Sequence, residues 1–312
     1  MGISDVRFQI SDLASAFSAN IGVGATLQSE IIHLKSQVTF RVPASTSNLG
    51  PGYDALGVAL RVFNQVTVRR EADAQIDAMP AAAAARFFAK AKTAPFPFAW
   101  QIEGEVPRSR GMGSSVTVRL GLLAGLNELA GAPLDRTALF QICAELEGHP
   151  DNAAPAAFGG FTVAGGKEVA RFEVDPELNF VLLIPDFEIA TPDARRALPD
   201  TIDRLGAARS CANACRITAA FASGNYEMLE GAFEDHLHQP YREKALIPFL
   251  TKVITAGENA GALGGFLSGS GSTICCITLE DPEPVMLAML AAAPPGARGI
   301  VTQADNVGAG QI

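Results

Sequence analysis

The residues with the clearest potential for chemistry form one short segment rich in glycine and serine, Pro107-Arg108-Ser109-Arg110-Gly111-Met112-Gly113-Ser114-Ser115. Glycine adopts backbone conformations that other residues resist, and it lets backbone N–H groups come close to a ligand. A helix that begins at Ser114 or Ser115 adds unpaired N–H groups and the positive end of its dipole, and both favour a bound phosphate. Either serine hydroxyl could also reach a phosphate-bound Mg²⁺, which is a hard cation.

The alternative for this segment is a plain turn in which a serine caps the following helix. The segment does not end in the Gly-Lys-Ser/Thr of a P-loop, and it is not the dinucleotide fingerprint. Short glycine motifs recur by chance. Taken alone, the segment therefore does not separate a phosphate site from a structural turn.

A second polar segment covers residues 145–152, at the expected end of a helix. It contains Glu145, Glu147, His149, Asp151 and Asn152. A carboxylate here could complete the shell of a Mg²⁺ ion, and the last three residues could orient a polar substrate. The alternative is a helix cap with solvated charges, since turns attract the same residue types.

Two further loops carry similar residues: 43–54, with the sequence PASTSNLGPGYD, and 268–273, with the sequence SGSGST. Each of the two is alone more typical of a turn than of a site. The presence of all four segments in one chain is the unusual feature. It favours a site assembled from several loops.

Six stretches of the chain carry a family resemblance: PASTSNLGPGYDALG, VPRSRGMGSSVTV, EGHPDNAAPAAFGGF, ATPDARRALP, DHLHQPYREKALIP and LSGSGST. They follow one another in the order found in the homoserine kinases of the GHMP kinase superfamily, which the chain resembles from residue 38 to its C-terminus. The glycine-serine loop and the loop at 268–273 are typical of the whole superfamily. EGHPDN, HQPYR and ARRALP are more typical of the homoserine kinases.

The resemblance implies an α+β, two-lobed GHMP kinase fold, with a left-handed β-α-β element in the first lobe and a ferredoxin-like second lobe. It implies that ATP binds to the segment 107–115 and that Ser115 and Glu145 hold Mg²⁺. We choose Glu145 over Glu147 because the family's metal carboxylate belongs to the helix before the turn.

For the acceptor, the resemblance implies L-homoserine, bound by Asn48, Asp54, His149, Asp151, Asn152, Thr191, Arg195, Arg242 and Gly269. Elementary chemistry agrees, because this substrate carries an ammonium and a carboxylate. Asp54 or Asp151 can pair with the ammonium. Arg195 and Arg242 can clamp the carboxylate through charge-assisted hydrogen bonds. The alternative for each arginine is a solvated surface cation.

Phosphoryl transfer depends chiefly on positioning and charge neutralisation. Some members of the superfamily place an aspartate base where this chain has Asn152, and an amide cannot take a proton. We therefore expect Asn48 and Asn152, with Asp151 beside them, to position the acceptor hydroxyl without a dedicated base. Two alternatives stay open: a GHMP kinase for another small alcohol, and a catalytically silent GHMP-fold protein that senses a ligand.

The elements that must position these residues follow from hydrophobic periodicity. Alternation predicts strands at 38–42, 58–62, 66–68 and 98–106, and we expect further strands at 161–164, 180–184, 273–279 and 299–302. Helical patterns cover 81–94, 114–131, a stretch after Asp135, 205–223, 226–237, 247–260 and 284–293. Strands and helices mix without regular β-α alternation, which is typical of an α+β fold. We expect an extension of uncertain structure over 1–36, a first lobe over 37–190 and a second lobe over 191–312.

Composition bounds the partners and the compartment. The chain has 24 basic and 33 acidic side chains, a net charge of −9, and its basic residues are scattered. Nucleic acid and membrane surfaces are therefore poor partners. The five cysteines form an odd number, which indicates reduced thiols and a cytoplasmic protein. No signal peptide or membrane-length apolar run is visible. As partners we expect the small-molecule substrate and a second copy of the chain, in a homodimer.

Overall fold

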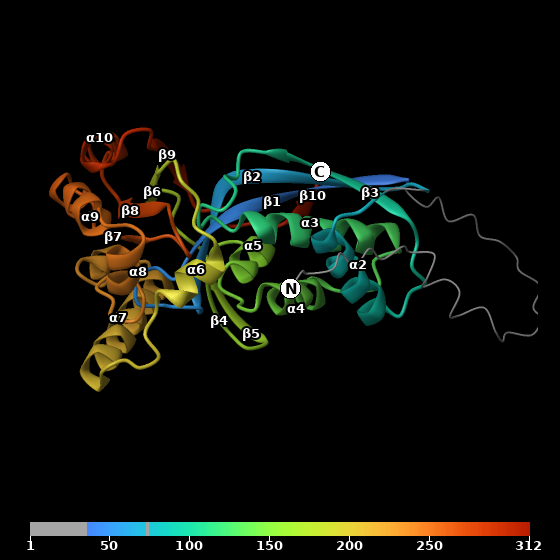
Figure 1. The fold of residues 1–312 in the computed structure, drawn as a ribbon, viewed down its shortest axis with the longest axis horizontal. Helices are drawn as coiled ribbons and strands as arrows, with labels where there is room; N and C mark the ends of the chain where they lie inside the picture. Colours follow the sequence, from blue (N-terminus) through green and yellow to red (C-terminus); the bar gives the residue numbers. More distant parts are fainter. Residues whose placement is uncertain (1–35, 73–74) are drawn as a thin grey trace, which may run out of the picture.

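The computed structural model describes residues 36–72 and 75–312, which form two β-sheets with helices packed against them (Figure 1). The extension expected over 1–36 lies outside the described residues, apart from residue 36. The arrangement confirms the predicted α+β class, with one sheet in each half of the molecule.

The first sheet is built around a long antiparallel hairpin of β1 (Gln37–Ser47) and β2 (Leu56–Arg70). Its strand order is β10-β1-β2-β4-β5, and β3 also pairs with β2. The remaining strands are β3 (Phe98–Gly104), β4 (Phe161–Gly165), β5 (Glu168–Phe172) and β10 (Gly310–Gln311). The hairpin leaves 48–55 as a loop, so the turn-rich segment expected there is shorter than its sequence suggests.

Four helices lie on one side of this sheet: α2 (Ala78–Ala91), α3 (Ser114–Leu129), α4 (Arg136–Glu147) and α5 (Ala153–Phe158) (Figure 1). The central helix is α3, which is buried along most of its length and contacts both β1 and β2. Gly121 allows this close approach, since a Cβ there would come within 2.6 Å of the Val66 side chain. The start of α3, and with it the loop at 107–113, is thereby held in a fixed place.

The second sheet has the order β7-β8-β6-β9, with β6 (Asn179–Ile184), β7 (Gly264–Leu267), β8 (Ile274–Thr278) and β9 (Arg298–Gln303). Val181 and Leu183 of β6 face α9 (Leu250–Asn259) and α10 (Pro282–Ala292), whereas Phe180 and Leu182 face the opposite way into a core shared with the first sheet. This alternation is the period of two expected for a strand buried on both faces.

The connecting elements of the second half are α6 (Thr191–Arg196), α7 (Arg204–Ser223), the 3₁₀ helix η1 (Tyr226–Leu229) and α8 (Gln239–Ala245). The helix predicted over 226–237 is wrong, because only η1 forms there. Gly231 has a positive φ of 66°, and the Asp235 carboxylate accepts hydrogen bonds from the backbone N–H groups of Leu237, His238 and Gln239. The positive φ of Gly231 falls just after η1, and the hydrogen bonds of Asp235 lie at the start of α8.

Sheet membership also corrects the assignment of 180–184 to the first half of the molecule. β6 pairs with β8 and β9, so the change of sheet falls between β5 and β6 and not near residue 190. The C-terminal strand β10 returns to the first sheet and pairs with β1. A local sequence pattern does not show that β6 pairs with β8 and β9, or that β10 pairs with β1.

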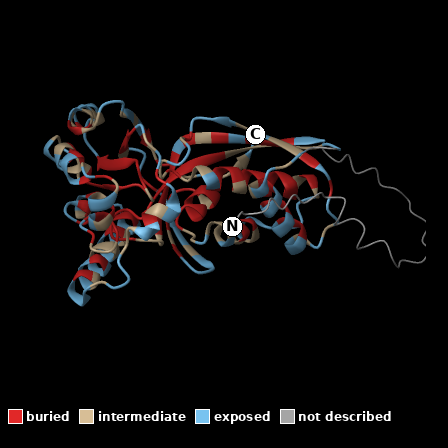
Figure 2. Ribbon diagram, viewed as in Figure 1, coloured by how far each residue is buried: buried red, intermediate tan, exposed pale blue. Residues whose placement is uncertain are grey.

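Figure 2 shows buried residues running through β1, β2 and α3 and on into the second sheet. A β-bulge between Pro43 and Ala44 divides the long hairpin. Val42 and Val66 pack under the helices of the first half, whereas Ala44 and Leu60 belong to the core shared with the second sheet. One hairpin therefore carries part of both cores. In 36–72 and 75–312, no helix combines the length and the apolar character that crossing a membrane requires.

Candidate active site

The four polar segments meet around one cavity of about 610 Å³ between the two sheets. The expected substrate residues all line it: Asn48, Asp54, His149, Asp151, Asn152, Thr191, Arg195, Arg242 and Gly269. Of the segment 107–115, residues 108–111 and 113–115 line the cavity. Met112 is instead fully buried in the shared core, and Pro107 borders a neighbouring hollow. The chain thus brings together residues that lie more than a hundred positions apart.

The loop before α3 has its carbonyl groups tied to the protein. Those of residues 109–112 accept, in turn, from Ile189 N, Thr273 N, Ser268 Oγ and Ser45 N. Carbonyl and N–H point in opposite directions within one trans peptide unit. The N–H groups of residues 110–113 therefore point away from those partners. Together with the N-terminus of α3 beside them, these N–H groups are donors that could hold an anion.

Positive backbone φ values shape this loop. Gly111 has φ of 73° and Gly113 has φ of 68°. A Cβ at Gly111 would lie 2.1 Å from the carbonyl oxygen of Ser268, and one at Gly113 would lie 2.5 Å from Ser45 Oγ. Both glycines are thus required by conformation and by space.

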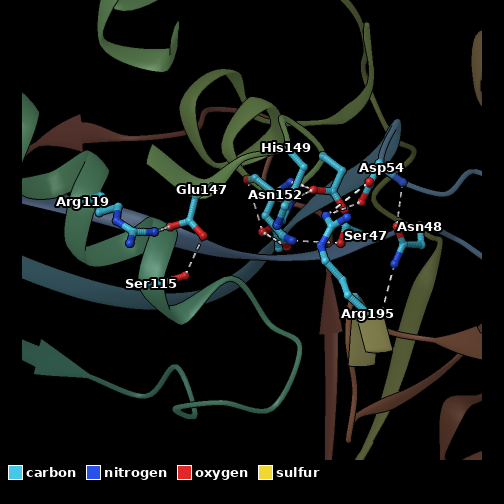
Figure 3. Close-up of polar contacts among 12 residues, drawn as sticks. Ser47, Asn48, Asp54, Ser115, Arg119, Glu147, His149, Asn152 and Arg195 are labelled. Atoms are coloured by element: carbon cyan, nitrogen blue, oxygen red, sulfur yellow. Dashed lines mark hydrogen bonds and ion pairs between the residues drawn. The ribbon is translucent and has the colours of Figure 1, made fainter. Parts of the chain in front are cut away.

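Beside the loop, Ser115 faces a carboxylate of α4, and Figure 3 shows the pair at one end of the site. Ser115 Oγ donates to Glu147 Oε2 at 3.0 Å, and the guanidinium of Arg119 also binds this carboxylate. The Glu147 side chain is only 9% exposed. A serine hydroxyl and a carboxylate are hard oxygen donors, so the pair fits Mg²⁺.

The prediction of Glu145 as the metal ligand is corrected by this geometry. The Glu145 side chain is 61% exposed and points toward Arg86 of α2, 3.8 Å away. It does not line the cavity, whereas Glu147 does. Two residues along a helix are separated by about 200° of rotation, so the two carboxylates leave α4 on opposite faces.

Two asparagines line the site, both held by hydrogen bonds: Asn152 lies near the middle of the residues labelled in Figure 3, and Asn48 lies at the end away from Ser115. The Asn152 amide accepts from Ser45 Oγ at 2.9 Å and donates to Ser47 Oγ at 2.9 Å. The Asn48 amide donates to the carbonyl of Gly269 at 2.9 Å and accepts from the backbone N–H of Asp54 at 3.0 Å. Each amide retains one N–H and one lone pair for a ligand.

A concentrated group of acids and one imidazole lies next to the asparagines. His149 Nδ1 contacts Asp151 Oδ1, and the ligand atoms of Asp54, His149 and Asp151 all lie within 4.8 Å of one another. Burial raises the pKa of the Asp54 carboxyl, and the charge of Asp151 raises it further, against the opposing effect of Arg195. For His149, burial lowers the pKa, but the Asp151 hydrogen bond and charge outweigh it, so the pKa is raised. The cluster favours a bound cation.

Two arginines complete the polar end of the cavity. Arg195 Nη2, on α6, contacts both carboxylate oxygens of Asp54 at 3.1 and 3.2 Å. Arg242, on α8, is buried, and it donates to the carbonyls of Ala194 and Gly269 at 3.2 and 2.8 Å. Neither arginine is a freely solvated surface cation.

Sequence reasoning missed Arg119, Ser45 and Ser47 as residues of this site, and it named Glu147 only as the rejected alternative to Glu145. Arg119 lies four residues after Ser115 on α3, and this spacing places both side chains on one helix face. The two serines lie at the end of β1, where alternation along the strand could have selected them. The apolar end of the cavity was missed as well. It is lined by Met79 and Pro80 of α2 and by Trp100 and Ile102 of β3.

An anion-binding loop, a serine–carboxylate pair and a cluster of opposite charges around one cavity are the parts of a small-molecule kinase. Known proteins agree with this class. The family model described as GHMP kinases N terminal domain matches residues 79–160 of this chain. The family model described as GHMP kinases C terminal matches residues 217–294. The homoserine kinase of Synechococcus sp. is 39% identical over 276 residues, which cover 81% of this chain and 90% of the relative. That of Moorella thermoacetica is 36% identical over 270 residues, which cover 81% and 91%. The chain belongs to the homoserine kinase family of the GHMP kinases.

Solved structures confirm the two-lobed GHMP kinase fold. The homoserine kinase from Cytophaga hutchinsonii superposes with a TM-score of 0.81 at 23% identity, covering 93% of this chain and 100% of that one. A mevalonate kinase superposes with a TM-score of 0.65 at 12% identity, covering 86% and 99%. At these identities the likeness concerns the fold alone.

Proposed function

We propose that the chain phosphorylates the side-chain hydroxyl of L-homoserine with ATP, forming O-phospho-L-homoserine, a step of threonine biosynthesis. The observation that carries the proposal is the Asp54–Arg195 ion pair inside the cavity. Its two charges match the two ends of an amino-acid zwitterion. A bound substrate would exchange this internal pair for two pairs of its own, ammonium with Asp54 and carboxylate with Arg195. The names of the relatives point to the same acceptor.

The second arginine supports a carboxylate site. The charge of Arg242 is not cancelled by its contacts with Ala194 and Gly269, because both are with neutral carbonyls. A guanidinium whose charge is buried in this way gains most from a carboxylate ligand. Thr191 lies at the start of α6, on the same wall of the cavity as Arg195, and adds a hydroxyl donor.

For the nucleotide, we assign the triphosphate to the loop 108–115 and the base to the apolar end at Met79, Pro80, Trp100 and Ile102. Aromatic and aliphatic side chains suit the flat, apolar faces of a purine. The loop then directs the terminal phosphate toward Asn152, whose Oδ1 lies 3.2 Å from the position of a Cβ at Gly113.

Ser115 and Glu147 are the residues that would hold Mg²⁺. When bound, Mg²⁺ neutralises charge on the phosphate oxygens. Arg119 shares the Glu147 carboxylate and fixes its direction. This assignment replaces Glu145 by Glu147 and keeps Ser115.

The site catalyses transfer by positioning the acceptor hydroxyl, without a side chain that acts as a dedicated base on it. Asn152 is held by Ser45 and Ser47, and its remaining amide N–H and lone pair can orient the acceptor hydroxyl for in-line attack on the terminal phosphate. Asn48 and Asp151 complete the surroundings of that hydroxyl. The proton passes to the transferred phosphate or to solvent. Asp151 is the acid that could act as a base instead, and Asp151→Asn tests this. We expect the variant to bind homoserine more weakly. Loss of turnover with intact homoserine binding would show that Asp151 acts as a base.

The proposal is tested by ADP release from Mg-ATP with and without L-homoserine, together with mevalonate, shikimate and L-threonine as alternative acceptors. We expect release that depends on homoserine. Activity on an acceptor that lacks an amino-acid carboxylate would contradict the arginine assignment. No acceptor-dependent release would favour a silent ligand sensor, although such a protein has no need to keep Ser115, Glu147 and the loop together.

Two further predictions concern the state of the protein. The first is a cytoplasmic location, which the free thiols of Cys143, Cys211, Cys215, Cys275 and Cys276 support. A homodimer stays a prediction, and light scattering on the eluting protein would measure it against the chain mass of 32.6 kDa.

A further inference from the structure

His238 is a buried imidazole just outside the cavity, between a loop of the first half and an arginine of the second. It is fully buried and precedes α8. Its Nε2 lies 2.8 Å from the carbonyl oxygen of Gly50, in the loop that carries Asn48 and Asp54. Its Nδ1 lies 3.2 Å from Nη1 of Arg242. The ring thus bridges the two halves of the substrate site.

These partners determine the protonation of the ring. A guanidinium only donates, so Nδ1 must accept and carries no proton. A carbonyl only accepts, so Nε2 must carry the proton and donate it to Gly50. The neutral Nε2–H tautomer satisfies both contacts. In agreement, burial lowers the pKa of His238 to about 4, despite the opposing charge of Asp235.

The surroundings hold this ring firmly. The Asp235 carboxylate binds three backbone N–H groups at the start of α8 and lies 3.6 Å from Nε2. The Tyr53 ring packs at 5.2 Å between centroids. A Cβ at Gly50 would come within 2.6 Å of the Phe233 carbonyl oxygen, so the loop lies tightly against this segment.

We propose that His238 is a positioning residue that fixes the Arg242 guanidinium for the substrate carboxylate, with its own ring held in place by the carbonyl of Gly50. The inference rests on the proposed function. The neutral His238 ring accepts a hydrogen bond from Arg242 and leaves the positive charge of the guanidinium uncancelled. A carboxylate at that position would also accept the hydrogen bond, but it would cancel the charge. The ring also keeps the Asp235 carboxylate on its Nε2 side, away from Arg242. Arg242 therefore stays both ordered and available to an anion.

Two substitutions separate the contacts of the ring. His238→Asn retains an acceptor at the place of Nδ1, toward Arg242. His238→Gln retains a donor near the place of Nε2, toward Gly50. In the full chain with saturating Mg-ATP, we expect the homoserine KM to rise about tenfold in H238Q and less than about threefold in H238N, since only H238N keeps the hydrogen bond to the guanidinium. We expect kcat and the ATP KM to stay within about twofold in both variants, because the lost interaction is with the ground state and the transition state alike.

A second measurement reports on the carboxylate alone. 3-Aminopropan-1-ol keeps the ammonium and hydroxyl of homoserine but lacks the carboxylate, so its inhibition constant against homoserine should be unchanged in both variants. A KM that rises equally in H238N and H238Q, or an inhibition constant that rises in step with KM, would overturn the role of His238. So would failure of both variants to fold, which would show a purely structural ring.

Wild-type turnover is measured first, so that failure of the proposed function can be distinguished from failure of the positioning role of His238. Absence of homoserine-dependent ADP release by the wild type would overturn the proposed function. Wild-type turnover with equal loss in both variants would overturn the positioning role and leave the function standing.

Discussion

Asp54 shows how a single residue of this site can favour binding at the expense of folding. Its carboxylate is partly buried and lies near Asp151, and both effects raise its pKa. A pKa raised in the folded state contributes stability below the unfolded value of 3.8, and this contribution is lost as the pH rises through the folded value. At neutral pH the ionised Asp54 is therefore a cost to the folded protein.

We predict that Asp54→Asn is at least as stable as the wild type at pH 7 while its homoserine KM rises about tenfold or more, because the ammonium loses its charged partner. The Arg195 pair is partly exposed, so its loss should cost less than about 1 kcal/mol. Thermal unfolding at pH 7 and pH 4 measures the effect, and the advantage of the variant should shrink at the lower pH. Asp193→Asn, which removes an exposed acid on α6, is the control. A lower melting temperature for D54N at pH 7 would contradict the argument.

The choice between the two glutamates of α4 is also decided residue by residue. We predict that Glu147→Gln lowers kcat/KM by about a hundredfold and raises the Mg²⁺ concentration needed for half-maximal rate, since an amide replaces a charged ligand. Glu145→Gln is the matched control on the same helix and should stay within about twofold of the wild type, because solvated surface side chains contribute little. A titration of MgCl₂ at fixed ATP distinguishes them. The reverse order of effects would restore Glu145 as the ligand.

Among the elements, the loop before α3 tests whether backbone shape alone builds the phosphate site. Gly111 and Gly148 both have positive φ, 73° and 85°, but a Cβ meets the Ser268 carbonyl at Gly111 and open space at Gly148. We predict that Gly148→Ala costs about 1 kcal/mol of stability, the usual cost of the left-handed conformation. Gly111→Ala should cost clearly more and raise the ATP KM about tenfold or more, because the loop must shift from its place over the anion. If the two variants had equal effects in urea unfolding and in ATP kinetics, the lack of space for a Cβ at Gly111 would not matter to the site.

Much of this arrangement of elements follows from local patterns. Alternating residues located β1, β2 and β3, and helical patterns located α3 and α7. The short elements α6, α8 and β7 were missed, because tertiary contacts and not periodicity maintain them. The sheet to which β6 belongs depends on pairing with β8 and β9, far away in sequence.

The site shows the same division between local and distant information. Family motifs indicated its substrate residues, and all of them line the cavity. The choice of Glu147 over Glu145 depends on which face of α4 meets α3. That is a question of helix packing, which the motif does not contain.

At the scale of the molecule, the two sheets share one core and cannot be expected to unfold separately. Phe161 of the first sheet stacks on Phe221 of α7 with ring centroids 4.2 Å apart and planes 8° from parallel. Gly269 adds a link between the sheets at the site, where its backbone N–H binds the carbonyl of Ser47. The site residues of both halves are therefore ordered together.

We predict one cooperative thermal transition, with equal calorimetric and van't Hoff enthalpies, because the shared core spans both halves. Val66→Ala removes volume under the helices of the first half, and Phe221→Leu removes the stacked ring. Each should lower the temperature of that same transition, by roughly 1–2 °C for every kcal/mol lost. Leu287→Ala, at a position 59% exposed on α10, is the control and should leave it within about 1 °C. Scanning calorimetry that resolved two transitions, with V66A moving only one, would show that the halves fold as independent units joined at the active site.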